Sequence, residues 1–115
     1  MRLAIIALLP LTLLVACAGG GVAGRCGTRE ARLANASATP LEQAYATREG
    51  EVASGDNQLG QADLAPGATG ALRFPGTGRY RLRVVWADGR AVELPDLDGC
   101  AVRRVTVTED GMRAE

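Results

Sequence analysis

Side chains that could carry out acid–base catalysis are scarce in this chain of 115 residues. It contains no histidine, so the commonest general base and metal ligand is absent, and proton transfer would fall to carboxylates or to a cysteine. The sequence has no G-x-S-x-G motif, no P-loop and no paired-thiol metal motif, and its serines, Ser37 and Ser54, lie in loop-like segments. These absences predict a protein that is not an enzyme and that carries no cofactor or metal.

Acidic residues two positions apart, Asp96 and Asp98, precede Gly99 in a pattern that calcium-binding loops also show. The segment lacks the third oxygen position and the distal glutamate of such a loop. Aspartate and glycine are common in turns for reasons of backbone geometry alone. We therefore interpret residues 96–99 as a turn.

Arginines alternate with apolar residues between positions 79 and 86. The arginines are Arg79, Arg81 and Arg83, and the apolar residues are Tyr80, Leu82, Val84 and Trp86. A period of two predicts a strand with one face in the core, where Trp86 would lie, and one face in water. The arginines, extended by Arg73, would form a basic stripe for an anionic partner such as a lipid phosphate or an acidic polymer. The alternative, which we favour, is a solvated face offset by cross-strand acids such as Glu93.

Charge is balanced along the whole chain, with 13 basic residues, 13 acidic residues and a net charge of zero. A basic patch or an excess of positive charge is the usual electrostatic signature of a protein that binds nucleic acid. We therefore expect no nucleic-acid partner.

The N-terminal segment has the layout of a secretory signal peptide. Arg2 precedes an apolar run over residues 3–16, and small residues follow it. This run is too short to cross a bilayer, which takes about 20 apolar residues. Pro10 interrupts it and three glycines at 19–21 follow, so we expect a cleaved signal rather than a membrane span.

Residues 14–17, Leu-Val-Ala-Cys, resemble the lipobox of bacterial lipoproteins. The resemblance implies that residues 1–16 are removed and that Cys17 is acylated, which would anchor the chain through several acyl chains. Ala18 rather than aspartate follows the cysteine, which in Gram-negative lipoproteins implies passage to the outer membrane. A second cleavage stays open, because Ala16, Cys17 and Ala18 form an A-x-A pattern that an ordinary signal peptidase would cut.

Three cysteines are present, and exported chains fold where thiols pair. If Cys17 carries lipid, Cys26 and Cys100 remain as an even pair. We therefore expect a disulfide between Cys26 and Cys100, tying the start of the domain to its end. A free, reactive cysteine is the minor alternative.

Turn signals at short intervals predict an all-β fold, a small antiparallel sandwich with Ig-like or barrel-like architecture. We assign residues 17–27 to the lipid anchor and a Gly-rich tether, 28–109 to the domain, and 110–115 to a C-terminal tail. Asp88-Gly89 predicts a hairpin that returns through residues 90–94. Further strands are expected at 61–64, at 70–74 and after Cys100, with a bulge at Arg103-Arg104.

Residues 39–47 are ambiguous between helix and strand. Thr39-Pro40-Leu41-Glu42 matches a capping box with proline at the first helical position, and Leu41, Ala44 and Tyr45 keep helical spacing. The same residues fit an edge strand, because proline is tolerated where a strand begins.

Over residues 35–107 the chain resembles a family of small uncharacterised exported proteins and lipoproteins of proteobacteria. The matching segments are Ala44-Tyr45-Ala46-Thr47, residues 54–60, Leu64-Ala65-Pro66-Gly67, residues 78–90 and Asp98-Gly99-Cys100. The core Y-x-L-R-V-V-W-A-D-G-R, at 80–90, is the most specific part. The resemblance implies export, a β fold and a strand at Tyr45, and adds no activity.

Departures from the family pattern occur at four positions. The family tryptophan is Ser54 here, its loop aspartate is Asn57, and the aspartate after the core tyrosine is Arg81. The first family cysteine falls at Gly78, so Cys26 would take over as the partner of Cys100.

These observations predict a lipid-anchored, non-catalytic protein of the bacterial envelope that faces the periplasm. Its expected partners are the membrane, through the N-terminal lipid, and an envelope protein or an anionic polymer. The alternative is a soluble periplasmic protein, released after Ala18, that binds a ligand or a metal.

Overall fold

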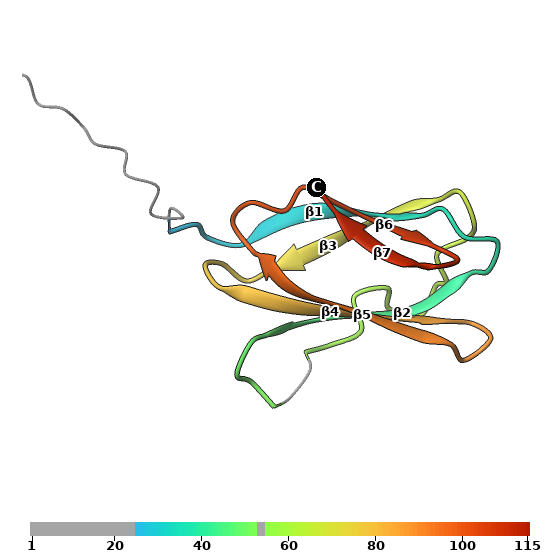
Figure 1. Cartoon of the computed structure of the whole chain (residues 1–115), viewed down its shortest axis with the longest axis horizontal. Coiled ribbons are helices and arrows are strands. Elements are labelled where there is room, and N and C mark those ends of the chain that lie inside the picture. The colour runs from blue at the N-terminus through green and yellow to red at the C-terminus, as the bar shows by residue number, and fades with distance from the viewer. Residues whose placement is uncertain (1–24, 53–54) are drawn as a thin grey trace, which may run out of the picture.

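The computed structural model describes residues 25–52 and 55–115, which form seven β-strands (Figure 1). They are β1 (Arg29–Asn35), β2 (Leu41–Arg48), β3 (Thr69–Phe74), β4 (Arg79–Trp86), β5 (Ala91–Asp98), β6 (Arg104–Thr108) and β7 (Gly111–Ala114). Within these ranges no residue is helical, and no helix long and apolar enough to span a membrane is found. The predicted signal peptide, Cys17, most of the tether and Ser54 lie outside the described residues.

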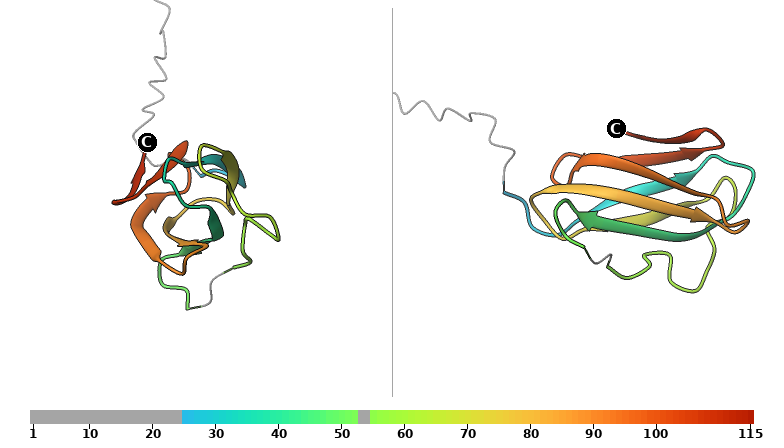
Figure 2. Two further views of the ribbon diagram at one scale, coloured as in Figure 1. Left: turned by 90° about the vertical axis from the view of Figure 1, so that its right-hand side faces the viewer. Right: turned by 60° about the horizontal axis from the view of Figure 1, so that its bottom comes forward.

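Two sheets pack against each other around a common interior (Figures 1 and 2). One sheet has the strand order β3-β1-β6-β7 and the other the order β2-β4-β5. All neighbouring strands are antiparallel except β1 and β6, which run parallel, as expected for strands joined by a long crossover. The predicted small, largely antiparallel β-sandwich is confirmed.

The core lies between the sheets and is supplied by alternate residues of each strand. Along β4 the inward residues are Tyr80, Leu82, Val84 and Trp86, all buried, as the period of two predicts. From the other sheet, Leu33, Leu72 and Phe74 are fully buried, and the Phe74 ring meets the Tyr80 ring edge-on with centroids 5.2 Å apart. Burying each such side chain stabilises the fold by roughly 1.5–3 kcal/mol.

Residues 41–48 form a strand rather than a helix, and the structure explains why the sequence was ambiguous. A register shift between Leu41 and Gln43 in the pairing of β2 with β4 inserts an extra residue. Leu41 and Ala44, three positions apart, are therefore both fully buried on the same face of a strand. The bulge produces the spacing that an amphipathic helix would show.

Other expected boundaries differ from the structure. Residues 110–115, expected as a tail, contain β7, which pairs with β6 and completes the four-stranded sheet. In the segment expected as a strand at 61–64, Leu64 makes one isolated bridge to Leu41. The bulge predicted at Arg103-Arg104 agrees with the hydrogen bonds there: the backbone N–H groups of both residues donate to the Glu115 carbonyl, at 2.8 and 3.1 Å, so two residues stand opposite one. This extra residue changes the phase between Val102 and Val105, which are both buried.

Edge strands β2 and β3 lie on the same open side of the sandwich, and two amide side chains cover them. The Asn57 side-chain oxygen accepts the Ala44 backbone N–H at 3.0 Å, and the Gln58 backbone N–H donates to the Ala44 carbonyl at 2.8 Å. The Gln58 amide accepts the Arg73 N–H at 2.6 Å and donates to the Arg73 carbonyl at 2.9 Å. Such cover protects exposed strand edges from pairing with another chain.

Candidate functional site

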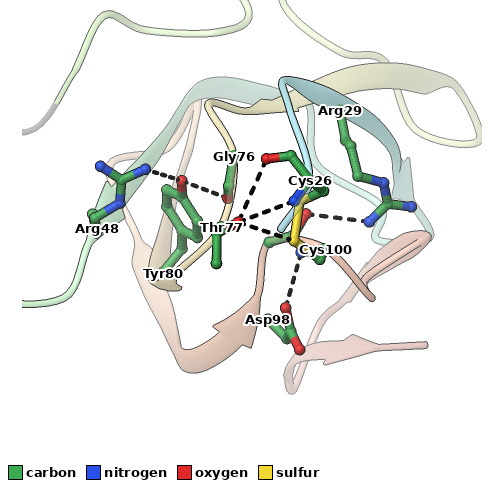
Figure 3. Close-up of a disulfide and its surroundings, with 9 residues drawn as sticks. Cys26, Arg29, Arg48, Gly76, Thr77, Tyr80, Asp98 and Cys100 are labelled. Carbon is green, nitrogen blue, oxygen red and sulfur yellow. Dashed lines mark hydrogen bonds between the residues drawn. A yellow bond between two sulfur atoms is a disulfide. The ribbon is translucent and has the colours of Figure 1, made fainter. Parts of the chain in front are cut away.

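A disulfide joins Cys26 to Cys100, with 5.7 Å between their Cα atoms (Figure 3). Cys26 lies just before β1 and Cys100 lies in the turn after β5, so the bond ties the two sheets together at one end of the sandwich. The predicted pairing is confirmed. The described chain begins at this end, with Arg25 next to the disulfide.

Close packing surrounds this disulfide (Figure 3). The Thr77 hydroxyl accepts the Cys26 backbone N–H at 3.0 Å. The Tyr80 hydroxyl donates to the Gly76 carbonyl at 2.9 Å and accepts a hydrogen bond from the Arg48 guanidinium at 2.8 Å. A Cβ at Gly99 would come within 2.5 Å of the Tyr80 ring, so only glycine fits there. We interpret this end as a structural clamp.

The arginine stripe predicted on β4 exists, and an acid partly neutralises it. Arg83 lies directly opposite Glu93 on β5, with 3.4 Å between guanidinium and carboxylate, and Arg81 reaches the same carboxylate at 3.9 Å. Arg79 donates to the Asp96 backbone carbonyl at 3.3 Å. Arg73 does not extend the stripe, because it lies on β3 in the other sheet. The geometry agrees with a solvated face offset by a cross-strand acid.

A second set of arginines gathers on the outer face of the four-stranded sheet. Arg32 on β1 and Arg104 on β6 are direct neighbours in the parallel pairing, and both are exposed. One step further along, Thr106 of β6 pairs with Arg113 of β7, which is also exposed. Because inward and outward residues alternate along each strand, these three side chains share one face. We call Arg32, Arg104 and Arg113 the outer arginine cluster.

Sequence reasoning missed the outer arginine cluster because its members come from three strands. Arg32 belongs to the first strand, and Arg104 and Arg113 belong to the last two. The alternation within each short strand predicts that each arginine points outward. Arg32 and Arg104 become neighbours only through the parallel pairing of β1 with β6. No pattern within either strand predicts that pairing.

Asn35 and Ser37, which match a glycosylation sequon, belong to a buried polar network. The Asn35 amide donates to the carbonyls of Thr39 at 2.9 Å and Leu64 at 3.0 Å, and its oxygen accepts the Ser37 hydroxyl at 2.6 Å. The Ser37 hydroxyl oxygen accepts the indole N–H of Trp86 at 3.0 Å. Asn35 is 1 % exposed and Trp86 is 3 % exposed, so both have structural roles in the folded domain.

The turn interpreted at residues 96–99 begins later than expected: Asp96 and Asp98 belong to the last residues of β5, and the turn lies at 99–101. The Asp98 carboxylate accepts the backbone N–H of Cys100 at 2.9 Å. Asp96 has a positive φ of 60°, a conformation that aspartate tolerates better than most residues. In the part of the chain that the structure describes, no group of three or more potential metal ligands comes together.

The hairpin between β4 and β5 contains an exposed ion pair that makes a titration prediction. Hydrogen bonds from the Arg90 backbone N–H, and secondly from its guanidinium, lower the pKa of the Asp88 carboxyl. Ionised Asp88 therefore stabilises the hairpin above the carboxyl's unfolded pKa, and the contribution is lost as the pH falls through the lower folded pKa. A carboxyl NMR titration should show this lowered pKa. In Arg90→Ala the pKa should return only part of the way, because the backbone donor remains; a complete return would contradict this assignment.

The described residues thus bring together a cross-linked end, one arginine stripe paired with Glu93, and one outer arginine cluster. The arginines of the stripe and of the cluster lie on paired strands, so the strand register sets the spacing of their charges. In comparisons with protein-family models, curated proteins and solved structures, nothing matches this chain.

Proposed function

We propose that this protein is a lipid-anchored component of the bacterial cell envelope that binds or spaces other envelope components without catalysing a reaction. The observation that carries the proposal is the Cys26–Cys100 disulfide. It accounts for two of the three cysteines and leaves Cys17, at the end of the lipobox-like sequence, without a cysteine partner in the same chain. A structural disulfide also fits an oxidising compartment outside the cytoplasm.

The position of Cys26 supports the proposal further. Residues 18–25 join Cys17 to Cys26, and they are rich in glycine. Eight residues can span at most about 30 Å of extended chain. An acylated Cys17 would therefore hold the sandwich close to the membrane, with its disulfide end nearest to the anchor.

Metabolic labelling with a fatty-acid analogue, followed by membrane fractionation, tests the anchor. We expect the wild-type chain to take up label and to sediment with membranes, and Cys17→Ala to lose both properties. The matched control is Cys26→Ala/Cys100→Ala, which removes two thiols but should keep the label. Unchanged label and location in Cys17→Ala would refute the anchor. A mature N-terminus at Gly19 by mass spectrometry would instead establish the soluble periplasmic form.

A further inference from the structure

The outer arginine cluster places like charges side by side with no ion pair to offset them. Adjacent strands are about 4.8 Å apart, and like charges directly opposite each other destabilise a sheet. Arg32 and Arg104 stand in this relation. Among the described residues, no salt bridge within 4.0 Å involves Arg32, Arg104 or Arg113. Within the folded chain, their juxtaposition is therefore unfavourable.

The opposite sheet provides the comparison. There Glu93 lies between two arginines and forms an ion pair with each, Arg81 and Arg83. In the four-stranded sheet Glu115 stands opposite Arg104, where the two backbones exchange hydrogen bonds of 3.1 and 2.9 Å, but in the described part of the chain its carboxylate makes no ion pair within 4.0 Å. Arg32 has Arg104 on one side and Ala71 on the other, so no acid stands opposite it. The guanidinium groups are therefore open to an anion supplied from outside the chain.

Acids on this face do not remove the excess of positive charge. Glu30 lies opposite Arg73, and Glu115 follows β7 beside Arg104. Neither carboxylate has an ion pair within 4.0 Å in the described part of the chain. Arg73 together with the outer arginine cluster outnumbers these two acids, so the face keeps a net positive charge.

Small residues lie between the arginines on this face. Ala34 and Thr106 are each 7 % exposed and lie side by side in the sheet. Next to Arg32, the residues Glu30, Thr69, Gly70 and Ala71 line a shallow hollow of about 400 Å³, so one carboxylate borders it. Because Arg32, Arg104 and Arg113 are exposed, their planar guanidinium groups can donate bidentate hydrogen bonds to phosphate oxygens.

We propose that the outer arginine cluster binds the phosphates of an anionic phospholipid surface, so that the four-stranded sheet lies against the membrane. A sheet face with several exposed arginines matches a layer of phosphates in charge. This inference rests on the proposed lipid anchor for its geometry: with Cys17 in the bilayer, the eight residues between it and Cys26 would keep the domain where headgroup contacts are available at high local concentration. Acylation and a basic face then act as two membrane signals in one chain.

Vesicle co-sedimentation of the full chain carrying Cys17→Ala tests the cluster apart from the lipid. The probes are vesicles of phosphatidylcholine alone and vesicles containing phosphatidylglycerol. We expect binding to the anionic vesicles to exceed binding to the neutral ones, and to decline at high salt. Each arginine near an anionic surface contributes about fivefold in partitioning, so Arg32→Gln/Arg104→Gln should lower anionic binding about 25-fold.

The matched control is Arg81→Gln/Arg83→Gln, which removes the same charge from the opposite sheet and should change binding less than about twofold because that face lies beyond the screening length. The thermal midpoint of Arg32→Gln/Arg104→Gln should equal or exceed that of the parent, since the change relieves like-charge repulsion. Equal binding to both vesicle types, or equal losses in the two double variants, would overturn the proposal. So would binding to soluble polyphosphate without binding to vesicles. The fatty-acid labelling of wild type is read separately, so failure of the anchor and failure of the cluster are distinguishable.

Discussion

Replacing both Cys26 and Cys100 by alanine is expected to lower the free energy of unfolding by about 4.5 kcal/mol. The bond closes a loop with a sequence separation of 74 residues. In the chain-entropy model, a cross-link of that span removes conformational freedom from the unfolded chain worth about 4.5 kcal/mol. The free energy of unfolding of a small domain is about 5–15 kcal/mol, so the expected loss is a large fraction of the total stability. For a domain of this size the thermal midpoint should fall by about 20–30 °C.

Urea unfolding monitored by the fluorescence of Trp86, the single tryptophan, measures this change. Wild type in reducing agent should behave like Cys26→Ala/Cys100→Ala, because both lack the cross-link. Cys17→Ala should unfold like the oxidised wild type. A loss below about 1 kcal/mol in the double variant would show that the chain-entropy argument does not apply to this bond.

Asn35→Ala is expected to destabilise the domain by about 3 kcal/mol, because it leaves buried groups without partners. The amide satisfies the carbonyls of Thr39 and Leu64 and the backbone N–H of Ser37, and the residue is 1 % exposed. The Ser37 hydroxyl also loses its acceptor, so the environment of Trp86 should change in the native fluorescence spectrum.

Asn57→Ala is the matched control for this variant. Asn57 also bonds the backbone through its amide, to Ala44 and Gly60, but it lies where water has access. Its loss should cost no more than about 1 kcal/mol. Suppose that urea unfolding gives the same loss of unfolding free energy for Asn35→Ala and Asn57→Ala. Burial of the Asn35 network would then add nothing to the stability of the domain.

Features that depend on neighbours along the chain could be predicted from the sequence. The alternation from Arg79 to Trp86 predicts β4 and its buried face, and Asp88-Gly89 predicts the turn that follows, where Gly89 has a φ of 90°. The cysteine count predicts the Cys26–Cys100 bond. In each case the physical cause, a period of two, a positive φ or the pairing of thiols, acts locally or through composition.

Residues 41–48 and 111–114 show where local reasoning was insufficient. The bulge in β2 gave Leu41 and Ala44 helical spacing, and only pairing with β4 makes the segment a strand. The sequence of β7 is short and weakly apolar, and the segment forms a strand because it pairs with the edge of β6. Strand propensity depends on such context more than helix propensity does.

By itself, the sequence determined an all-β domain, its central strand and its disulfide, because periodicity, turn residues and cysteine number are properties of the chain. The tertiary structure alone decided which charges become neighbours. In the folded domain Arg81 and Arg83 form ion pairs with Glu93. Arg73 lies in the other sheet, and Arg32 lies beside Arg104. The physical reason is that strand order and register arise from packing the whole core, and no short stretch of sequence contains that information.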